Sequence, residues 1–475
     1  MNNRKGIINK ILFFDFIGMI FCIFKSFSYY EYSFWLLPTV YTFLFFITYV
    51  NRKLSSRNIG ALVLNITMSI RYVAIPVIYY STNELSRFAR NYNNLGSAIY
   101  LMIYEMIVLM LVLEISARKY YKKEKNMKTK KQPLLHLQYG KLLAIGISII
   151  VLGIGVFYKN LGAGFRVITT GKLEQSINFV NNNFIDILWE TLTTWIYVYL
   201  TMREAEKYES DHRNIHTTLV IVYTFIFILI TFIQSVAFSR WYTIISAISA
   251  IACLFKMFPQ SKKKILLSIG IPTIILLILI TSYKNAGFNI GETKFSDSIS
   301  DIFSSSNFDS YFSGPVNVNN AIGVKNNYKN LGMKTIINDM LNNMPIVNHY
   351  MDITQTSVYA YNASIGRIWN GVGDQIIPLL GQSIIYFGYI FAPLMGVITI
   401  LIVRKFDYLF KKNSSYMMYV YAFIAVWMAV EPMMLNLTIT INWFYIRIIP
   451  FALIFMITNK ISYKKYLEKD YKKNE

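Results

Sequence analysis

Charged residues and cysteine are scarce in this chain of 475 residues. Only 15% of the residues are charged and two are cysteine, whereas 55% are hydrophobic. An average soluble domain has about a quarter charged residues, so this composition excludes an ordinary soluble protein. Cys22 and Cys253 both fall inside apolar stretches, and they predict neither a disulfide nor a redox compartment. The sequence therefore indicates an integral membrane protein.

Motifs that hold metals or nucleotides are also missing. The four histidines and two cysteines have no spacing typical of zinc ligands. There is no Walker-type glycine loop and no Gly-x-Ser-x-Gly nucleophile elbow. No internal repeat is evident, which disfavours folds with two homologous halves, such as those of many secondary transporters. We therefore expect no metal and no cofactor.

Apolar stretches recur along the whole length. Each has about 17 to 22 residues, and a helix of that length crosses most or all of a hydrocarbon core about 30 Å thick. The pattern predicts an all-α, polytopic membrane protein with about twelve transmembrane helices. The predicted spans are residues 8–24, 32–50, 59–80, 96–115, 141–158, 184–202, 216–233, 241–258, 265–283, 381–403, 416–434 and 441–458.

Lysine and arginine gather in every second connection between these spans. They include Arg52, Lys53 and Arg57, the run from Arg118 to Lys131, and the tail from Lys460 onward. By the positive-inside rule these connections are cytoplasmic, so we expect a multi-pass protein of the cytoplasmic membrane with both termini inside. The net charge of +22 then indicates membrane lipids as partners, and not nucleic acid.

One connection is much longer than the others. The stretch from Lys284 to Leu380 is polar and rich in aromatic residues, and the charge pattern places it outside the cytoplasm. It divides the chain into four parts. These are residues 1–283 with nine membrane helices, the external loop 284–380, residues 381–458 with three membrane helices, and a basic cytoplasmic tail at 459–475.

A helix is predicted inside this loop. Between Lys334 and Met344, the apolar residues Ile336, Ile337 and Met340 recur at helical spacing. Such a helix could lie flat on the membrane surface or pack on a small core of the loop itself. Either arrangement makes the loop a folded structure.

Ionisable side chains inside the spans each need a partner, because they cost at least about 2.5 kcal/mol at the centre of a bilayer. Arg71 and Glu105 lie at similar depth on antiparallel helices, so we predict that they pair. The pair could be structural or could line a polar cavity. Glu431 and Arg447, near the outer ends of the last two spans, are also predicted to pair.

Arginines on the predicted outer side are candidate ligands for an anion. Arg240 opens a span directly after a short external turn, at headgroup depth, and Arg367 and Arg166 lie in external loops. A guanidinium can bind a diphosphate through two hydrogen bonds and stays charged throughout a reaction. For Arg240, the alternative is that its side chain only reaches toward lipid phosphate.

A proton acceptor can be sought in the same long loop. His349 is the only histidine on the predicted outer side, and histidine exchanges a proton near pH 7. Asp374 is a second candidate for the base. A histidine in a loop is more often incidental, so both assignments are hypotheses.

The sequence Ile377-Pro378-Leu379-Leu380-Gly381-Gln382-Ser383-Ile384-Ile385-Tyr386-Phe387-Gly388-Tyr389-Ile390, followed by Gly396, returns the long loop to the membrane. This stretch, the late external loop and an arginine at the mouth of a span together resemble the Wzy-type oligosaccharide repeat-unit polymerases of capsule and O-antigen assembly. The architecture is similar over most of the chain, and specific residues are similar over about 20 positions.

This resemblance implies a metal-independent glycosyltransferase. It would join lipid-linked oligosaccharide repeat units at the outer face, with undecaprenyl diphosphate as carrier and a chain-length regulator as a further partner. Arg240 and Arg367 match the role of external arginines that hold the diphosphate. Two alternatives remain at this stage, a flippase for lipid-linked oligosaccharides and a glycosyltransferase that uses polyprenyl-phosphate sugars.

Overall fold

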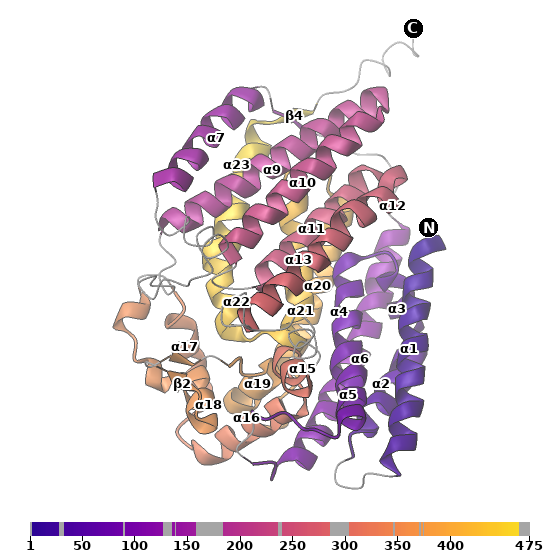
Figure 1. Ribbon diagram of the computed structural model, residues 1–475, viewed down its shortest axis with the longest axis vertical. Helices are drawn as coiled ribbons and strands as arrows, with labels where there is room; N and C mark the ends of the chain where they lie inside the picture. Colours follow the sequence, from indigo (N-terminus) through magenta and orange to yellow (C-terminus); the bar gives the residue numbers. More distant parts are fainter. Residues whose placement is uncertain are drawn as a thin grey trace. The chain divides into compact units, whose positions relative to one another are not determined.

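The computed structural model describes residues 2–27, 33–88, 91–126, 135–137, 139–157, 184–235, 240–285, 304–344, 347–369, 372–373 and 375–464 (Figure 1). These residues are almost entirely helical, with four strands of two residues each as the exception. By their contacts, they form two compact units, each discontinuous in sequence.

The first unit comprises Met1–Met127, Ile302–Tyr408 and Ala425–Trp443. It therefore combines the first membrane helices with the folded part of the long loop. Its elements are α1 (Asn2–Ser26), α2 (Leu36–Ile47), α3 (Tyr49–Ser55), α4 (Ile59–Ser69), η1 (Ile70–Ala74), α5 (Ile75–Thr82), α6 (Leu95–Lys125), α15 (Ser305–Tyr311), α16 (Pro315–Asn327), α17 (Met333–Leu341), η4 (Val347–Tyr350), η5 (Ile353–Gln355), α18 (Ser357–Ile365), β2 (Ile368–Trp369), β3 (Val372–Gly373), α19 (Leu379–Phe387) and α22 (Leu437–Trp443).

The second unit comprises Lys128–Asp301, Leu409–Ile424 and Phe444–Glu475. Its elements are β1 (Leu135–His136), α7 (Gly140–Phe157), α9 (Phe184–Asp211), α10 (Asn214–Ser235), α11 (Arg240–Met257), η2 (Pro259–Ser261), α12 (Lys262–Ile265), η3 (Leu266–Gly270), α13 (Ile271–Asn285), η6 (Phe444–Ile448), α23 (Ile449–Ile461) and β4 (Tyr463–Lys464), which pairs with β1. The boundary between the units falls within α20 (Leu394–Lys412) and α21 (Met418–Met434).

Several helices are long and apolar enough to cross a membrane. Five have at least 18 residues, Gly6–Ser26, Ile59–Thr82, Leu95–Lys125, Asn214–Phe232 and Leu437–Ile461. Four shorter apolar helices are Leu36–Ile47, Gly140–Gly155, Trp241–Met257 and Met418–Met434. All nine (five and four) overlap spans that the sequence predicts. The structure is therefore that of an all-helical protein compatible with several membrane crossings.

The chain does not re-enter from the long loop as one helix. The sequence predicts a continuous span over residues 381–403, but α19 ends at Phe387 and α20 begins only at Leu394. Gly388 has φ +77, in the left-handed region that favours glycine and that ends helices. The apolar run is therefore divided between a short buried helix and a separate longer one.

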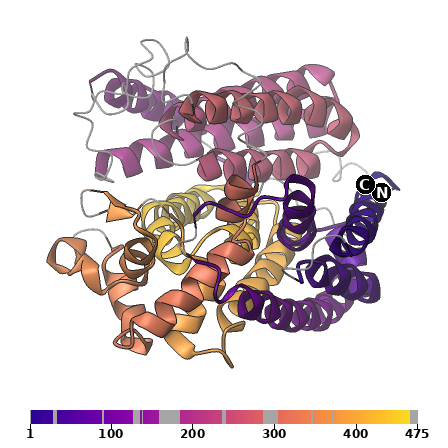
Figure 2. The same ribbon diagram turned by 60° about the horizontal axis from the view of Figure 1, so that its bottom comes forward.

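The described part of the long loop packs around its own core. Buried residues from three helices meet there, among them Ala321 of α16, Tyr361 of α18 and Ile385 of α19. In Figure 2 these helices, in orange, gather beside one another. A Cβ added at Gly381 would lie 2.4 Å from Ala321 Cβ, so α16 and α19 approach more closely there than any larger residue allows. The described part of the loop is thus a folded part of the first unit.

Candidate functional site

The structure describes the predicted site residues to different extents. Arg166 and Asp374 lie outside the described residues, and for Arg240, at the start of α11, and His349, in η4, only the backbone is described. Arg367 is described completely. His349 and Arg367 belong to the first unit, and Arg240 belongs to the second. Arg367 is therefore the predicted ligand whose surroundings can be followed in detail.

Arg367 follows the end of α18. Gly366 ends this helix in the left-handed conformation, with φ 72. The Arg367 backbone N–H donates to the carbonyl of Asn362 at 2.8 Å. The guanidinium is exposed, and its Cζ lies 4.7 Å from the centre of the Phe88 ring. A cation above an aromatic face is stabilised by the ring's quadrupole, so this charge has a defined position.

The backbone at Phe88 is hydrogen-bonded to the folded loop. Its carbonyl accepts a hydrogen bond from the Asn320 side chain at 3.2 Å, and Asn320 is a buried residue of α16. The Arg87 backbone N–H donates to the Ser306 hydroxyl at 3.0 Å. The segment before α6 is therefore attached to α15 and α16 of the folded loop. These bonds fix the backbone that carries the Phe88 ring.

The hairpin that starts with Arg367 is closed at its base by one buried amide. Its strands β2 and β3 pair in antiparallel fashion. The Asn362 side chain donates to the carbonyl of Gln375 at 3.0 Å and accepts from the Gln375 backbone N–H at 2.9 Å. Because both bonds join the end of α18 to the end of the hairpin, the position of Arg367 is set by buried structure.

A second polar network lies where α18 begins. Asp339 of α17 accepts hydrogen bonds from the Ser357 backbone N–H at 2.9 Å and from the Tyr386 hydroxyl. Gln382 donates to the Ser357 hydroxyl at 2.9 Å and accepts from the Leu437 backbone N–H at 2.8 Å. Burial raises the pKa of the Asp339 carboxyl above its usual range.

This network gives a role to residues of the re-entry sequence. Gln382 and Tyr386 were noted there for the resemblance that they carry, whereas the structure shows them joining α19 to α17, α18 and α22. Their role is therefore to hold the folded loop on the membrane helices. Gln382 stands in a run of apolar residues, and a buried amide needs several hydrogen-bond partners. This is the feature of the sequence that could have indicated the network.

Arg71 and Glu105 form the predicted ion pair. Arg71 Nη1 lies 2.9 Å from Glu105 Oε2, and both side chains are buried. The pair has further partners, since Arg71 Nε donates to the carbonyl of Ser313 at 2.9 Å and the Tyr72 hydroxyl donates to Glu105 at 3.0 Å. Ser313 belongs to the connection between α15 and α16. The intramembrane pair thus also anchors the long loop.

Asp309 is a site residue that the sequence reasoning missed. Its carboxylate accepts hydrogen bonds from the Tyr79 hydroxyl at 2.5 Å and from the backbone N–H groups of Val316 at 3.1 Å and Asn317 at 3.0 Å. Burial raises the pKa of Asp309 to about 6, against the effect of these bonds. Pro315 at the first turn of α16 was the available signal, because an acidic side chain often precedes such a helix start.

The predicted pair of Glu431 and Arg447 is wrong. Arg447 Nε pairs with Glu190 of α9 at 2.7 Å, and its Cζ lies 4.1 Å from the centre of the Tyr242 ring. Glu431 accepts a hydrogen bond from the Thr440 hydroxyl at 2.6 Å. The two spans are adjacent in sequence, but α22 turns Thr440 toward Glu431, and η6 turns Arg447 toward α9.

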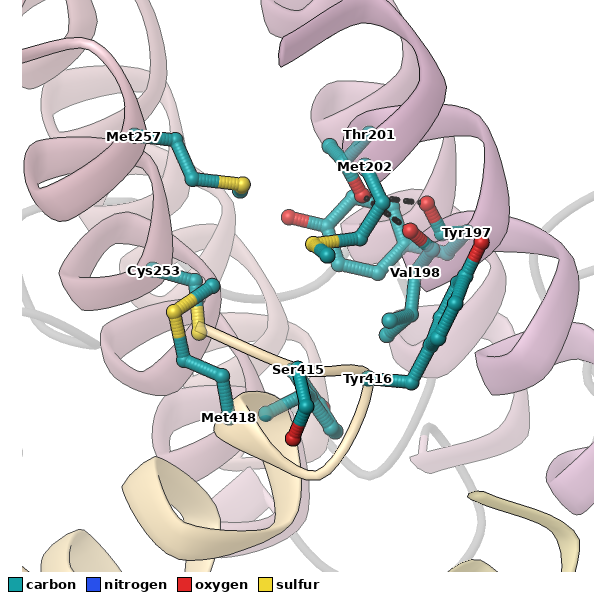
Figure 3. Close-up of a pocket in the computed structure, with 10 residues that line it drawn as sticks. Tyr197, Val198, Thr201, Met202, Cys253, Met257, Ser415, Tyr416 and Met418 are labelled. Atoms are coloured by element: carbon teal, nitrogen blue, oxygen red, sulfur yellow. Dashed lines mark hydrogen bonds between the residues drawn. The ribbon is translucent and has the colours of Figure 1, made fainter. Parts of the chain in front are cut away.

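The second unit contains a small cavity (Figure 3). It is lined by Tyr197, Thr201, Met202, Cys253 and Tyr419, among others. It has room for about one water molecule. A sugar or a diphosphate would not fit. Among the described residues, no three histidine, cysteine or acidic side chains gather closely enough to hold a metal ion.

No family model, curated protein or solved structure matches this chain. The described site consists of an exposed guanidinium on an aromatic ring, at the start of a hairpin whose base is closed by a buried amide. Such a group can donate hydrogen bonds to two oxygens of a phosphate at once, because its N–H groups form a rigid, planar fork.

Proposed function

We propose that this protein polymerises lipid-linked oligosaccharide repeat units at the outer face of the cytoplasmic membrane. The proposal includes the finer topology that the sequence indicates, with about twelve spans, both termini cytoplasmic and residues 284–380 outside. The donor would be a growing glycan on a polyprenyl diphosphate, and the acceptor the next repeat unit on its own carrier. Arg367 carries the proposal, because it offers an exposed, positioned cation in the folded loop.

The proposed reaction is a single glycosyl transfer. The acceptor hydroxyl oxygen forms a bond to the anomeric carbon of the donor glycan, and the bond from that carbon to the diphosphate oxygen breaks. The electron pair leaves with the polyprenyl diphosphate. Arg367 stabilises the negative charge on this leaving group, a role that the sequence also predicts for Arg240 and Arg166, so that no metal is required. His349 or Asp374 takes the proton of the hydroxyl.

Buried charges of the first unit support an enzyme more than a transporter. A transport pathway needs polar side chains that face water within the membrane. Arg71 and Glu105 are instead buried and joined to each other and to the loop. They therefore serve the loop that carries Arg367, and the flippase alternative gains no support from this pair.

Deleting the gene distinguishes the proposed polymerase from a flippase. In a cell that uses this protein for a surface polymer, we expect the polymer to be replaced by single repeat units on the outside, because synthesis and export of each unit would continue. The units are detected on intact cells with a sugar-specific lectin or antibody. Accumulation of lipid-linked units accessible only after the membrane is opened would contradict the proposal and favour a flippase.

A further inference from the structure

Helix α17 exposes two large apolar side chains and buries two polar ones. Met333 and Ile337, one turn apart, are 68% and 58% exposed, whereas Thr335 and Asp339, also one turn apart, are 3% and 0% exposed. A helix on the surface of a water-soluble domain has the opposite arrangement. The predicted apolar stripe is therefore divided, because Ile336 packs on the loop core whereas Ile337 is exposed together with Met333.

The polar side chains on the inward side of α17 can be buried because each is hydrogen-bonded. Asp339 accepts from Ser357 and Tyr386, as described above. The Thr335 hydroxyl accepts from the Gly332 backbone N–H at 3.1 Å, before the first turn of the helix. These bonds fix the rotation of α17 about its axis. The outward direction of Met333 and Ile337 follows from that rotation.

The exposed apolar surface continues beyond α17. Ile353 of η5 and Tyr350 of η4 are also exposed. The Asn338 side chain donates to the carbonyl of Gln355, the last residue of η5, at 3.4 Å, and α17 packs against η5. Four large hydrophobic side chains from three consecutive elements are therefore exposed on the surface. Burying one such side chain contributes about 1.5 to 3 kcal/mol, so leaving all of them in water would be unfavourable.

Helix α17 lies beside the start of a candidate membrane span. It packs against α22, which forms the first two turns of the candidate span Leu437–Ile461. The buried network reinforces this contact, because Gln382 binds both the Leu437 backbone and Ser357, whose backbone binds Asp339. A helix fixed beside the start of a membrane span lies in or next to the headgroup layer.

We propose that α17 is an interfacial anchor that lies in the headgroup layer of the membrane, with Met333 and Ile337 directed toward the acyl chains. Its ligand is the phospholipid leaflet. Lys334 is exposed within the helix, and its ammonium group can meet lipid phosphates. The anchor holds the folded loop against the bilayer. This proposal does not depend on the reaction that the protein catalyses.

Site-directed spin labelling tests the anchor in the full-length protein. Cys22 and Cys253, both buried, are replaced by Ala, and a nitroxide is attached to Met333→Cys or Ile337→Cys in phospholipid vesicles. Both positions are exposed, so the substitution leaves the packing intact. Lys329→Cys is the water reference. Phe16→Cys, exposed in the middle of the candidate span Gly6–Ser26, is the lipid reference. Accessibility to oxygen and to a water-soluble nickel complex is measured at each label.

We expect labels at Met333 and Ile337 to behave like the label at Phe16. Oxygen should reach them well, and the nickel complex should reach them several-fold less than it reaches the Lys329 label. Adding Ile337→Glu to the Met333 label should raise its nickel accessibility, because a charge there opposes insertion. Nickel accessibility equal to that at Lys329 would overturn the proposal. So would protection from both reagents, which would indicate that a protein, such as a second copy, covers this face.

Discussion

Replacing Glu105 by Ala is expected to destabilise the protein by about 3 to 5 kcal/mol, because Arg71 is left as a buried charge without its carboxylate. Arg71 and Glu105 are 0% and 2% exposed, so water cannot replace the lost partner. The same guanidinium holds the carbonyl of Ser313, so the loop should loosen together with the helix pair. Thermal unfolding in detergent and proteolysis of the loop measure the two effects.

Matched variants separate the charge from the packing. Tyr72→Phe removes one hydrogen bond to Glu105 and should cost only about 1 kcal/mol. Arg71→Met combined with Glu105→Leu leaves no buried charge, so it should recover much of the stability that Glu105→Ala loses. Recovery stays partial because the Ser313 carbonyl loses its donor. A Glu105→Ala protein that unfolds like the unchanged protein would show that the pair contributes nothing.

Replacing Arg367 by Ala is expected to slow polymerisation by about 100- to 1000-fold, the cost typical of losing one group that stabilises a developing negative charge. On a gel of surface glycans, the ladder of long chains should collapse toward single repeat units. Arg367→Lys should recover only part of the activity, because an ammonium group cannot form the two parallel bonds of a guanidinium. Protein levels in the membrane are compared in parallel.

Two further variants show whether the position of the charge matters. Lys329→Ala removes an exposed cation from the same folded loop and should leave the ladder unchanged. Phe88→Leu retains Arg367 but removes the ring beneath it, and a cation–π contact at an exposed site contributes about 0.5 to 1 kcal/mol, so the loss should be a few-fold. A normal ladder in the Arg367→Ala strain would remove Arg367 from the site.

Apolar runs were enough to predict most helices, but not which polar residues would be buried. Helix α16 is the clearest case, since its sequence contains Asn317, Asn319 and Asn320 and yet all three are buried. Their amides bind backbone carbonyls, including those of Asn91 and Phe88. These partners lie more than 200 residues away in the sequence, so no local pattern could reveal that this polar stretch would form the centre of a unit.

Some contacts of the candidate residues could be predicted from the sequence, and others could not. Depth along two antiparallel helices was sufficient to pair Arg71 with Glu105, because the membrane makes any other arrangement costly. It was not sufficient for Arg447, because depth alone does not say which helix face points where, and Glu190 is the observed partner. The contact between Arg367 and the Phe88 ring could not be predicted either, because Phe88 comes from a different part of the chain.

Reconstitution tests the proposed activity most directly. The purified protein is placed in vesicles with lipid-linked repeat units as the only glycan, in the presence of a metal chelator, and the products are separated by length. The proposal predicts chains of two or more repeats together with one released polyprenyl diphosphate for each new linkage, and neither product from Arg367→Ala protein of equal stability. Repeat units that remain single while the protein stays folded, with no diphosphate released, would contradict it.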